Sequence, residues 1–403
     1  MRLAIPGETG ADERRVAMVP EVAKKLVSSG WTVTVQSGAG ERAFFPDERY
    51  VDAGVEIAPD AATCQQGAEV VVRVQAPTAG EATAVPEGGI ILSFFQPAAA
   101  ADAVRALAGR RATVFSFDLL PRISRAQSMD ALSSQATVSG YRAALVAATG
   151  LGRFFPMFMT AAGTVPPAKV LVMGVGVAGL QAIATARRLG AVVRAYDVRA
   201  AAKEEAESLG ATFVDLGVTA EGTGGYAREL SAEEQAAQQQ ALADEVASAD
   251  VVITTAAVPG RRAPRLVTRA MVEAMGVGAL VVDMAADSGG NCECTEPGAD
   301  VVVSGTTVVG MANPPSGMPT HASALYSRNV ANVLALMSAD GGLALDWTDQ
   351  IIAGTCVLKE GRPVHAAAAE ILGVPAEPVV APAAPPAAST PPAPGAPQGG
   401  GAG

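Results

Sequence analysis

Three closely spaced glycines form the strongest chemical motif of the chain. Gly174, Gly176 and Gly179 follow the apolar run 169–173 and precede the helix-forming stretch Leu180–Leu189. In such a G-x-G-x-x-G turn the first glycine permits a tight bend, the second lets the backbone approach a pyrophosphate, and the third allows close packing of helix on strand. The helix N-terminus then offers free amides and a positive dipole end to phosphate groups. The motif predicts a dinucleotide-binding turn.

An acidic residue closes the next apolar run. Asp197 follows the stretch 192–196 and lies 23 residues after Gly174. A carboxylate at this place accepts hydrogen bonds from an adenosine ribose, which favours NAD and disfavours the 2′-phosphate of NADP. Arg199, two residues further on, is the opposing signal. A methyltransferase-like site, an FAD site and a vestigial fold remain alternatives to NAD binding.

A polar cluster precedes the stretch 130–149, which we expect to form one long helix. Its side chains, within fourteen residues, are Arg122, Ser124, Arg125, Gln127, Ser128, Asp130, Ser133, Ser134 and Gln135. One interpretation is structural, with Asp130 or Ser128 capping the free amides of the helix N-terminus. The other is functional, with the cluster as a hydrogen-bonding platform at a cleft between two domains.

Charge and cysteine content exclude several classes of function. The 403 residues include 29 Lys or Arg and 40 Asp or Glu, a formal charge of -11. A net acidic chain is a poor ligand for nucleic acid or for an anionic membrane surface. Four cysteines do not make a disulfide framework in so long a chain and indicate a reducing compartment. Cys292 and Cys294 have the wrong spacing for a zinc knuckle, and we interpret neither His321 nor His365 as a metal ligand, so no metal site is expected.

Short apolar runs alternate with helical patterns and must position these residues. We expect strands at Arg2–Ile5, Thr32–Gln36, Glu69–Val74, Ile90–Phe95, Thr113–Ser116, Val170–Met173, Val192–Tyr196, Val251–Thr254 and Leu280–Asp283. Helical patterns include Glu21–Ser29, Ala98–Ala108 and Ala322–Met337. Such alternation is typical of parallel sheets covered by helices, and continuous apolar runs are typical of strands buried on both faces. The pattern predicts an α/β chain with two doubly wound Rossmann-like domains separated by a cleft.

The domain boundaries follow from the same pattern. We expect an N-terminal domain at 1–128 completed by a return segment at 311–373, and a nucleotide-binding domain at 129–310. Residues 374–403 hold nine of the 27 prolines and one charged residue, so they predict a flexible tail or linker. The uncharged run 170–186 is short and rich in glycine, so we expect no membrane span there.

Further motifs, together with the glycine turn, resemble those of a known family. They are Glu8-Thr-Gly10, Glu13-Arg-Arg-Val-Ala-Met-Val-Pro20, Gly38-Ala-Gly40, the cluster at 122–135, Thr160-Ala-Ala-Gly-Thr-Val-Pro166, Pro259-Gly260, Asp283-Met-Ala-Ala-Asp287-Ser-Gly-Gly290 and Met311-Ala-Asn-Pro314. Over residues 1 to 365 the chain resembles the alanine dehydrogenase and proton-translocating transhydrogenase superfamily. It is most similar to domain I of transhydrogenase, the domain that binds NAD(H).

The resemblance implies roles for individual residues. Arg122, Gln127, Asp130 and Ser133 match a family pattern that reaches the nicotinamide end of the cofactor, with Gln127 holding the carboxamide. A loop that closes over the nucleotide matches Gly224-Gly225-Tyr226. The implied contacts to the rest of the cofactor are Arg125, Gly174, Gly176, Val177, Ala178, Gly179, Asp197, Val198, Arg199, Gly225, Tyr226, Ala256 and Ala257.

Two positions separate the branches of the superfamily. Alanine dehydrogenases have a lysine and a histidine where this chain has Gln75 and Gln96, and oxidative deamination needs groups that move protons. Hydride transfer between two nicotinamide rings needs alignment and exclusion of water instead. Asp287 and Arg15 match residues that alanine dehydrogenases use, and they keep that alternative open.

The resemblance therefore implies the NAD(H)-binding subunit of a proton-translocating NAD(P)+ transhydrogenase. Its implied partners are a β subunit that binds NADP(H), a membrane-spanning second segment of the alpha subunit, encoded separately, and a second copy of the chain. The expected location is cytoplasmic, at the inner face of the plasma membrane. A stand-alone NAD-dependent alanine or amino-acid dehydrogenase and a non-catalytic NAD-binding module are the alternatives.

Overall fold

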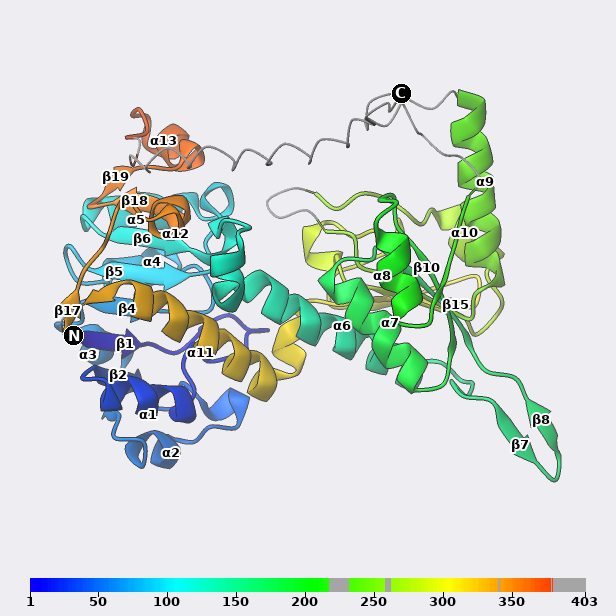
Figure 1. Cartoon of the computed structure of the whole chain (residues 1–403), viewed down its shortest axis with the longest axis horizontal. Coiled ribbons are helices and arrows are strands. Elements are labelled where there is room, and N and C mark those ends of the chain that lie inside the picture. The colour runs from blue at the N-terminus through cyan, green and yellow to red at the C-terminus, as the bar shows by residue number, and fades with distance from the viewer. Residues whose placement is uncertain (217–231, 258–261, 340, 378, 380–403) are drawn as a thin grey trace, which may run out of the picture.

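Two mainly parallel sheets, each with helices on both faces, organise the chain (Figure 1). The computed structural model describes residues 1–216, 232–257, 262–339, 341–377 and 379. The expected fold class is confirmed. The boundaries 1–128, 129–310 and 311–373 stay predictions. The expected tail, 374–403, lies outside the described residues apart from 374–377 and 379.

The first sheet has the strand order β19-β18-β6-β5-β4-β1-β2-β3. Its strands are β1 (Arg2–Ile5), β2 (Thr32–Gln36), β3 (Glu56–Ala58), β4 (Val70–Val72), β5 (Ile90–Ser93), β6 (Thr113–Ser116), β18 (Cys356–Lys359) and β19 (Arg362–Pro363). β1 to β6 pair in parallel, whereas β18 pairs antiparallel with β6. The C-terminal region of the described chain therefore extends the sheet that the first 116 residues begin.

Alternate residues of each buried strand face two separate cores. Val70 and Val72 pack into the core with helices α1 and α11, while Val71 packs into the core with α3 and α5. This alternation explains why the strands are continuously apolar in sequence. The helices around this sheet are α1 (Pro20–Ser28), α2 (Asp47–Val51), α3 (Ala61–Gln65), α4 (Ala79–Thr83), α5 (Ala101–Gly109), α11 (Pro319–Leu336), α12 (Gln350–Thr355) and α13 (Ala366–Leu372).

The second sheet has the order β11-β10-β9-β12-β13-β15-β14. Its strands are β9 (Lys169–Met173), β10 (Val192–Tyr196), β11 (Thr212–Phe213), β12 (Val251–Thr254), β13 (Leu280–Asp283), β14 (Asp300–Val303) and β15 (Thr306–Gly310). Only the edge strand β14 is antiparallel. Its helices are α6 (Ala131–Gly150), α7 (Val177–Arg188), α8 (Ala202–Ser208), α9 (Ala232–Ser248) and α10 (Arg269–Ala274). α6, α7 and α8 contribute to one core, whereas α9 and α10 contribute to the other.

Short elements connect or extend these layers. The 3-10 helices are η1 (Glu41–Ala43), η2 (Pro97–Ala99), η3 (Phe117–Leu119), η4 (Ser124–Met129), η5 (Ala286–Ser288) and η6 (Pro314–Gly317). Two small antiparallel pairs are β7 (Phe158–Thr160) with β8 (Gly163–Val165), and β16 (Ser338–Ala339) with β17 (Gly342–Leu343). Within the stretches of chain that the structure describes, no helix has the length and hydropathy to cross a membrane.

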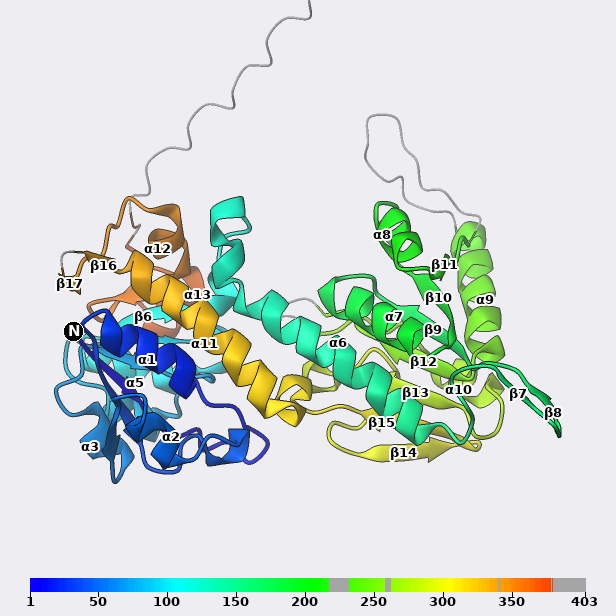
Figure 2. The same cartoon turned by 60° about the horizontal axis from the view of Figure 1, so that its bottom comes forward.

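The long helix α6 joins the two units (Figure 2). At its beginning, the Ser134 hydroxyl donates to Asn329 Oδ1 of α11 at 2.8 Å. Further along, Ala143, Ala144 and Ala147 enter the core that α7 shares. Gly140 lies between these two contacts, against the backbone of Ala178 on α7. A Cβ at Gly140 would overlap the carbonyl oxygen of Ala178, so only glycine lets the helices pack this closely.

We expect Gly140→Ala to destabilise the protein, because the added methyl group meets backbone that cannot move aside. Overpacking of this kind costs about 1–3 kcal/mol. Thermal melting of the two proteins side by side measures the loss.

Gly109→Ala is the matched control, since Gly109 also lies in a helix and nothing lies within 4 Å of a Cβ placed there. Gly109→Ala should leave the melting temperature unchanged or slightly higher. Equal melting temperatures for Gly140→Ala and the parent would contradict the close packing of α6 on α7.

Candidate functional site

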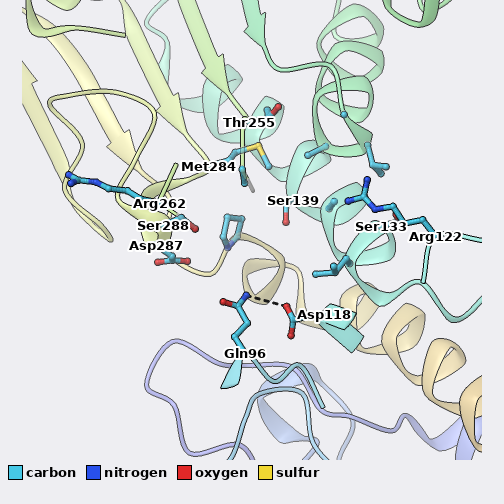
Figure 3. A pocket seen from close by; sticks show the side chains of 17 residues that line it. Gln96, Asp118, Arg122, Ser133, Ser139, Thr255, Arg262, Met284, Asp287 and Ser288 are labelled. Carbon is cyan, nitrogen blue, oxygen red and sulfur yellow. Dashed lines mark hydrogen bonds between the residues drawn. The ribbon is translucent and has the colours of Figure 1, made fainter. Parts of the chain in front are cut away.

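A cavity of about 700 Å³ lies between the carboxyl ends of the two sheets (Figure 3). It is lined by Gln96, Asp118, Arg122, Leu132, Ser133, Ala136, Ser139, Gly176, Val177, Ala178, Thr255, Ala257, Arg262, Met284, Asp287, Ser288 and Pro314. Gln96 and Asp118 follow strands β5 and β6, while the residues from 176 to 178 follow β9. Ligands of open α/β sheets bind at such carboxyl ends.

The glycine turn forms one wall of this cavity. Gly174 has a φ of +96°, and a Cβ there would meet the Thr255 hydroxyl at 2.7 Å. A Cβ at Gly179 would overlap the carbonyl oxygen of Gly174. At Gly176, by contrast, a Cβ would meet nothing within 4 Å. The first and third glycines are therefore required by close backbone packing, whereas the second faces open space.

Helix α7 begins at this open space. Its N-cap is Gly176, and no side chain caps the helix. Val177 and Ala178, the first two helical residues, line the cavity. Uncapped amides at the N-terminus of a helix are a ready site for an anion. The local geometry therefore suits a phosphate group.

Asp197 lies directly after β10, and its carboxylate is already engaged. Oδ2 accepts a hydrogen bond from the Val175 amide at 2.7 Å, and Oδ1 accepts one from Arg199 Nε at 3.0 Å. Burial alone would raise the pKa of this carboxyl, but the hydrogen bonds from Arg199 and Val175 outweigh burial and lower it. Asp197 is therefore ionised at neutral pH. The ion pair gives Arg199 a role other than binding a 2′-phosphate. Between them, Val198 is 82% exposed.

The polar cluster at 122–135 divides into different roles. Asp130 caps α6, because Oδ1 accepts from the Ser133 amide at 2.8 Å and Oδ2 accepts from the Ser133 hydroxyl at 2.6 Å. Arg122 and Ser133 line the cavity. Arg125 instead forms an ion pair with Asp349 at 2.6 Å. Gln127 is exposed in η4 and lies outside the cavity lining.

Arg15 is buried and forms an ion pair with Glu13 of the same unit. It is 3% exposed, and its Nε and Nη2 donate to the two oxygens of Glu13 at 2.7 and 2.6 Å. Glu13 also accepts from Gln75 Nε2 at 2.9 Å. Burial would raise the pKa of Glu13, but Arg15 and the other donors lower it to about 2. Neither Arg15 nor Gln75 lines the large cavity.

Several lining residues, Asp118 among them, were not anticipated from the sequence, whereas Gln96 was. Gln96 Nε2 donates to Asp118 Oδ1 at 3.2 Å across the floor of the cavity (Figure 3). Asp118 Oδ2 also accepts from the Phe95 amide at 2.8 Å, which fixes the carboxylate beside the end of β5. Ser139, Arg262 and Met284 line other walls. The sequence feature that could have pointed to Asp118 is its position, since it is an acidic residue two positions after the end of the buried strand β6.

Asp287 reaches the cavity from the loop after β13. Its Oδ2 accepts a hydrogen bond from the Asn313 amide at 2.7 Å. Ala257 lines the cavity, whereas the Ala256 carbonyl accepts from Asn291 Nδ2 at 2.8 Å. Gly224, Gly225, Tyr226, Pro259 and Gly260 lie outside the described residues. Among the residues described, no three His, Cys, Asp or Glu side chains gather as metal ligands would.

Comparison with known proteins identifies the family. The model "Alanine dehydrogenase/PNT, N-terminal domain" matches residues 4–139, and "Alanine dehydrogenase/PNT, C-terminal domain" matches residues 143–366. A relative from Rhodospirillum rubrum, the first of the separately named segments of its NAD(P) transhydrogenase subunit alpha, is 47% identical over 378 residues, 91% of this chain and 98% of that protein.

Two solved structures have the same architecture. The transhydrogenase from Sinorhizobium meliloti has a TM-score of 0.80 and 42% identity, covering 91% of this chain and 100% of that one. An L-alanine dehydrogenase has a TM-score of 0.78 and 26% identity, covering 93% and 99%. With two sheets facing one cavity and both family models matched, the chain belongs to the alanine dehydrogenase/PNT family of oxidoreductases.

Proposed function

We propose that the chain is the NAD(H)-binding subunit of a proton-translocating NAD(P)+ transhydrogenase. In the reaction, NADPH on a partner subunit passes a hydride from its C4 to C4 of NAD+ held here, giving NADP+ and NADH. The observation that supports this most directly is the cavity lining, which joins a phosphate-binding turn to amide, hydroxyl and carboxylate groups; among its described residues there is no lysine or histidine. Such a site can align a ring without a proton-shuttling ammonium or imidazole group.

The roles of individual residues follow from their places. The α7 N-terminus would bind the pyrophosphate at Gly176, and Asp197 would accept hydrogen bonds from the adenosine ribose. Arg122 and Ser133 also line the cavity, and we propose that the nicotinamide lies beside them. Asp130 orients Ser133. We further propose that Gln127 moves onto the carboxamide when the cleft is occupied.

The proposed partners are an NADP(H)-binding β subunit and a membrane-spanning second segment of the alpha subunit. The Rhodospirillum rubrum relative is named as the first segment of an alpha subunit. That name supports the presence of further subunits in the transhydrogenase to which the relative belongs. The proposed location is cytoplasmic, peripheral at the inner face of the plasma membrane. In this arrangement the proton path belongs to the membrane partners.

A stand-alone alanine dehydrogenase is the second candidate, because Asp287 lines the cavity as an available carboxylate. Against it, the buried ion pair with Glu13 keeps Arg15 from a substrate carboxylate. Gln75 donates to Glu13, and Gln96 donates to Asp118, so two neutral amides stand where deamination would need titrating groups.

Nucleotide selectivity tests the cofactor assignment. We expect NADH to bind the parent at least about tenfold more tightly than NADPH, because an ionised Asp197 favours a ribose diol and repels a 2′-phosphate. Asp197→Ser should weaken NADH binding and strengthen NADPH binding, since it also releases Arg199. Fluorescence titration of each nucleotide measures both constants.

The double variant Asp197→Ser with Arg199→Ala is the matched control, and it should lose the gain in NADPH affinity. Tighter binding of NADPH than NADH by the parent would contradict the cofactor assignment.

Hydride transfer tests the reaction. Mixed with an isolated NADP(H)-binding domain of transhydrogenase, the chain should oxidise NADPH at the expense of NAD+, and with alanine alone it should reduce no NAD+. For Gln127→Ala we expect the transfer rate to fall on the order of 100-fold with a smaller change in NADH affinity, since misalignment of about 1 Å costs that much.

Glu56→Gln, at an exposed carboxylate on β3, is the control and should keep the parental rate. NAD+ reduction with alanine alone would favour the dehydrogenase, and NADH binding without any transfer would favour a non-catalytic module.

We also propose a homodimer, and the β7–β8 hairpin supports it. The hairpin projects from the second unit (Figure 1), and all residues of both strands are exposed. Met159 is 78% exposed. At its base lies a hollow of about 620 Å³ lined by Leu151, Gly152, Arg153, Phe154, Val165, Pro166, Pro167, Ala168 and Asp250. An isolated two-stranded hairpin is marginal in water, so packing against a second copy would stabilise it.

We expect Phe158→Asp with Met159→Asp to give a monomer, because charges replace the apolar surface of the arm. Light scattering after gel filtration measures the mass. Val277→Asp changes an apolar residue as exposed as Met159 but outside the hairpin, and it should remain dimeric. A dimeric hairpin variant would exclude the arm from the interface.

A further inference from the structure

One asparagine lies where the chain crosses back from the second unit to the first. Asn313 comes between β15 and η6, and its backbone has φ +39° and ψ +60°. This left-handed conformation is uncommon for residues other than glycine, although asparagine tolerates it better than most. Strained backbone of this kind persists where surrounding contacts hold it.

The contacts of Asn313 reach both units. Its backbone amide donates to Asp287 Oδ2 at 2.7 Å, in the cavity wall of the second unit. Its side-chain Nδ2 donates to Glu13 Oε2 at 3.0 Å, and its Oδ1 accepts from Arg15 Nη2 at 3.3 Å, both in the first unit. A single residue therefore connects the cavity wall to the buried ion pair.

The same ion pair also contacts α6, where the chain passes from the first unit to the second. Arg15 Nη1 donates to Gln135 Oε1 at 2.8 Å, and Gln135 belongs to α6, the helix that carries the chain from the first unit to the second. The two crossings are also joined directly, because Arg142 of α6 donates to the Gly317 carbonyl at 3.1 Å. The buried guanidinium is thus shared by both connections between the units.

Charge explains why an amide suits this position. Glu13 carries a full negative charge, and the Asn313 Nδ2 group gives its Oε2 one of its donors. The Oδ1 atom of the same amide accepts from the Arg15 cation. An amide satisfies both groups because it has a donor and an acceptor, whereas a carboxylate at 313 would face Glu13 with like charge.

We propose that Asn313 is a positioning residue that fixes the orientation of the two units across the cavity, and through it the alignment needed for hydride transfer. The part of this inference that concerns hydride transfer rests on the proposed function. Asn313 acts through Asp287, Glu13 and Arg15 and is absent from the cavity lining. Motions between domains are often taken up by a few residues at the ends of helices and strands, and Asn313 lies at such a position, between β15 and η6.

Asn313→Gly is the informative variant. Glycine keeps the left-handed backbone and the amide bond to Asp287, while it removes the three side-chain hydrogen bonds to Asp12, Glu13 and Arg15 of the first unit. We expect transfer with the NADP(H)-binding domain to fall by about tenfold or more, because misplacement by a fraction of an ångström is costly. NADH affinity should change by less than about threefold, since the glycine turn is untouched.

A distance measurement tests the orientation without catalysis. Cys64, Cys292, Cys294 and Cys356 are all buried, so spin labels can be directed to Ser28→Cys and Ser208→Cys, at exposed positions of α1 and α8. Labelled chains diluted with unlabelled ones should give one narrow distance distribution in the parent. Asn313→Gly should broaden it, and Asn332→Ala, which removes a hydrogen bond from a half-buried asparagine of α11 to the Ser128 carbonyl, should not.

The possible results distinguish the positioning role of Asn313 from its link to hydride transfer. An unchanged distance distribution in Asn313→Gly overturns the positioning role, whatever the rate. A broadened distribution with an undiminished rate overturns the link to catalysis. If the parent itself transfers no hydride, the proposed function fails, and the width of the distribution still decides whether Asn313 fixes the orientation.

Discussion

The close packing of α6 on α7 is the constraint on which the site depends. α6 begins beside the first unit, where Asp130 caps it, and ends in the core of the second. Because Gly140 lets the helix approach the backbone of Ala178, the same contact brings the N-terminus of α7 to the cavity that Ser133 and Ser139 of α6 line. Dinucleotide phosphates and the ring they carry would therefore be positioned by one helix pair, and motion between the units would have to occur at their ends.

The buried Glu13–Arg15 pair complements this helix contact. Buried ion pairs are weak contributors to stability, since desolvation offsets their attraction, yet removal of one partner leaves an uncompensated charge at a cost of about 3–5 kcal/mol. Here Glu13 also accepts a hydrogen bond from Gln75, and Arg15 donates hydrogen bonds to Gln135 and Asn313. These three partners belong to separate segments of the chain. Its directional bonds are thus better suited to specifying an arrangement of segments than to adding stability.

Local signals made nine strands and the glycine turn predictable from the sequence, whereas strands such as β3, β15 and β18 were missed and the site depends on contacts between distant segments. The strand Arg2–Ile5 has the bounds that the sequence predicts. Asp118 and Gln96, by contrast, meet only because β5 and β6 are neighbours in the sheet. Arg125 turns away from the cavity because Asp349, far along the chain, lies within 2.6 Å. Tertiary contacts, rather than residue type, therefore decide which member of the polar cluster serves which role.

The charges of the cavity bear on how a dinucleotide would be bound. The described part of its lining includes two arginines, Arg122 and Arg262, and two aspartates, Asp118 and Asp287, so these side chains have no formal excess of either sign. A pyrophosphate would thus be stabilised chiefly by the amides and dipole of α7, which act over a short range near Gly176. Such stabilisation depends on geometry more than on net charge. The orientation of α7 toward the first unit would therefore determine where the phosphates of a bound dinucleotide lie and, through them, where its ring can reach.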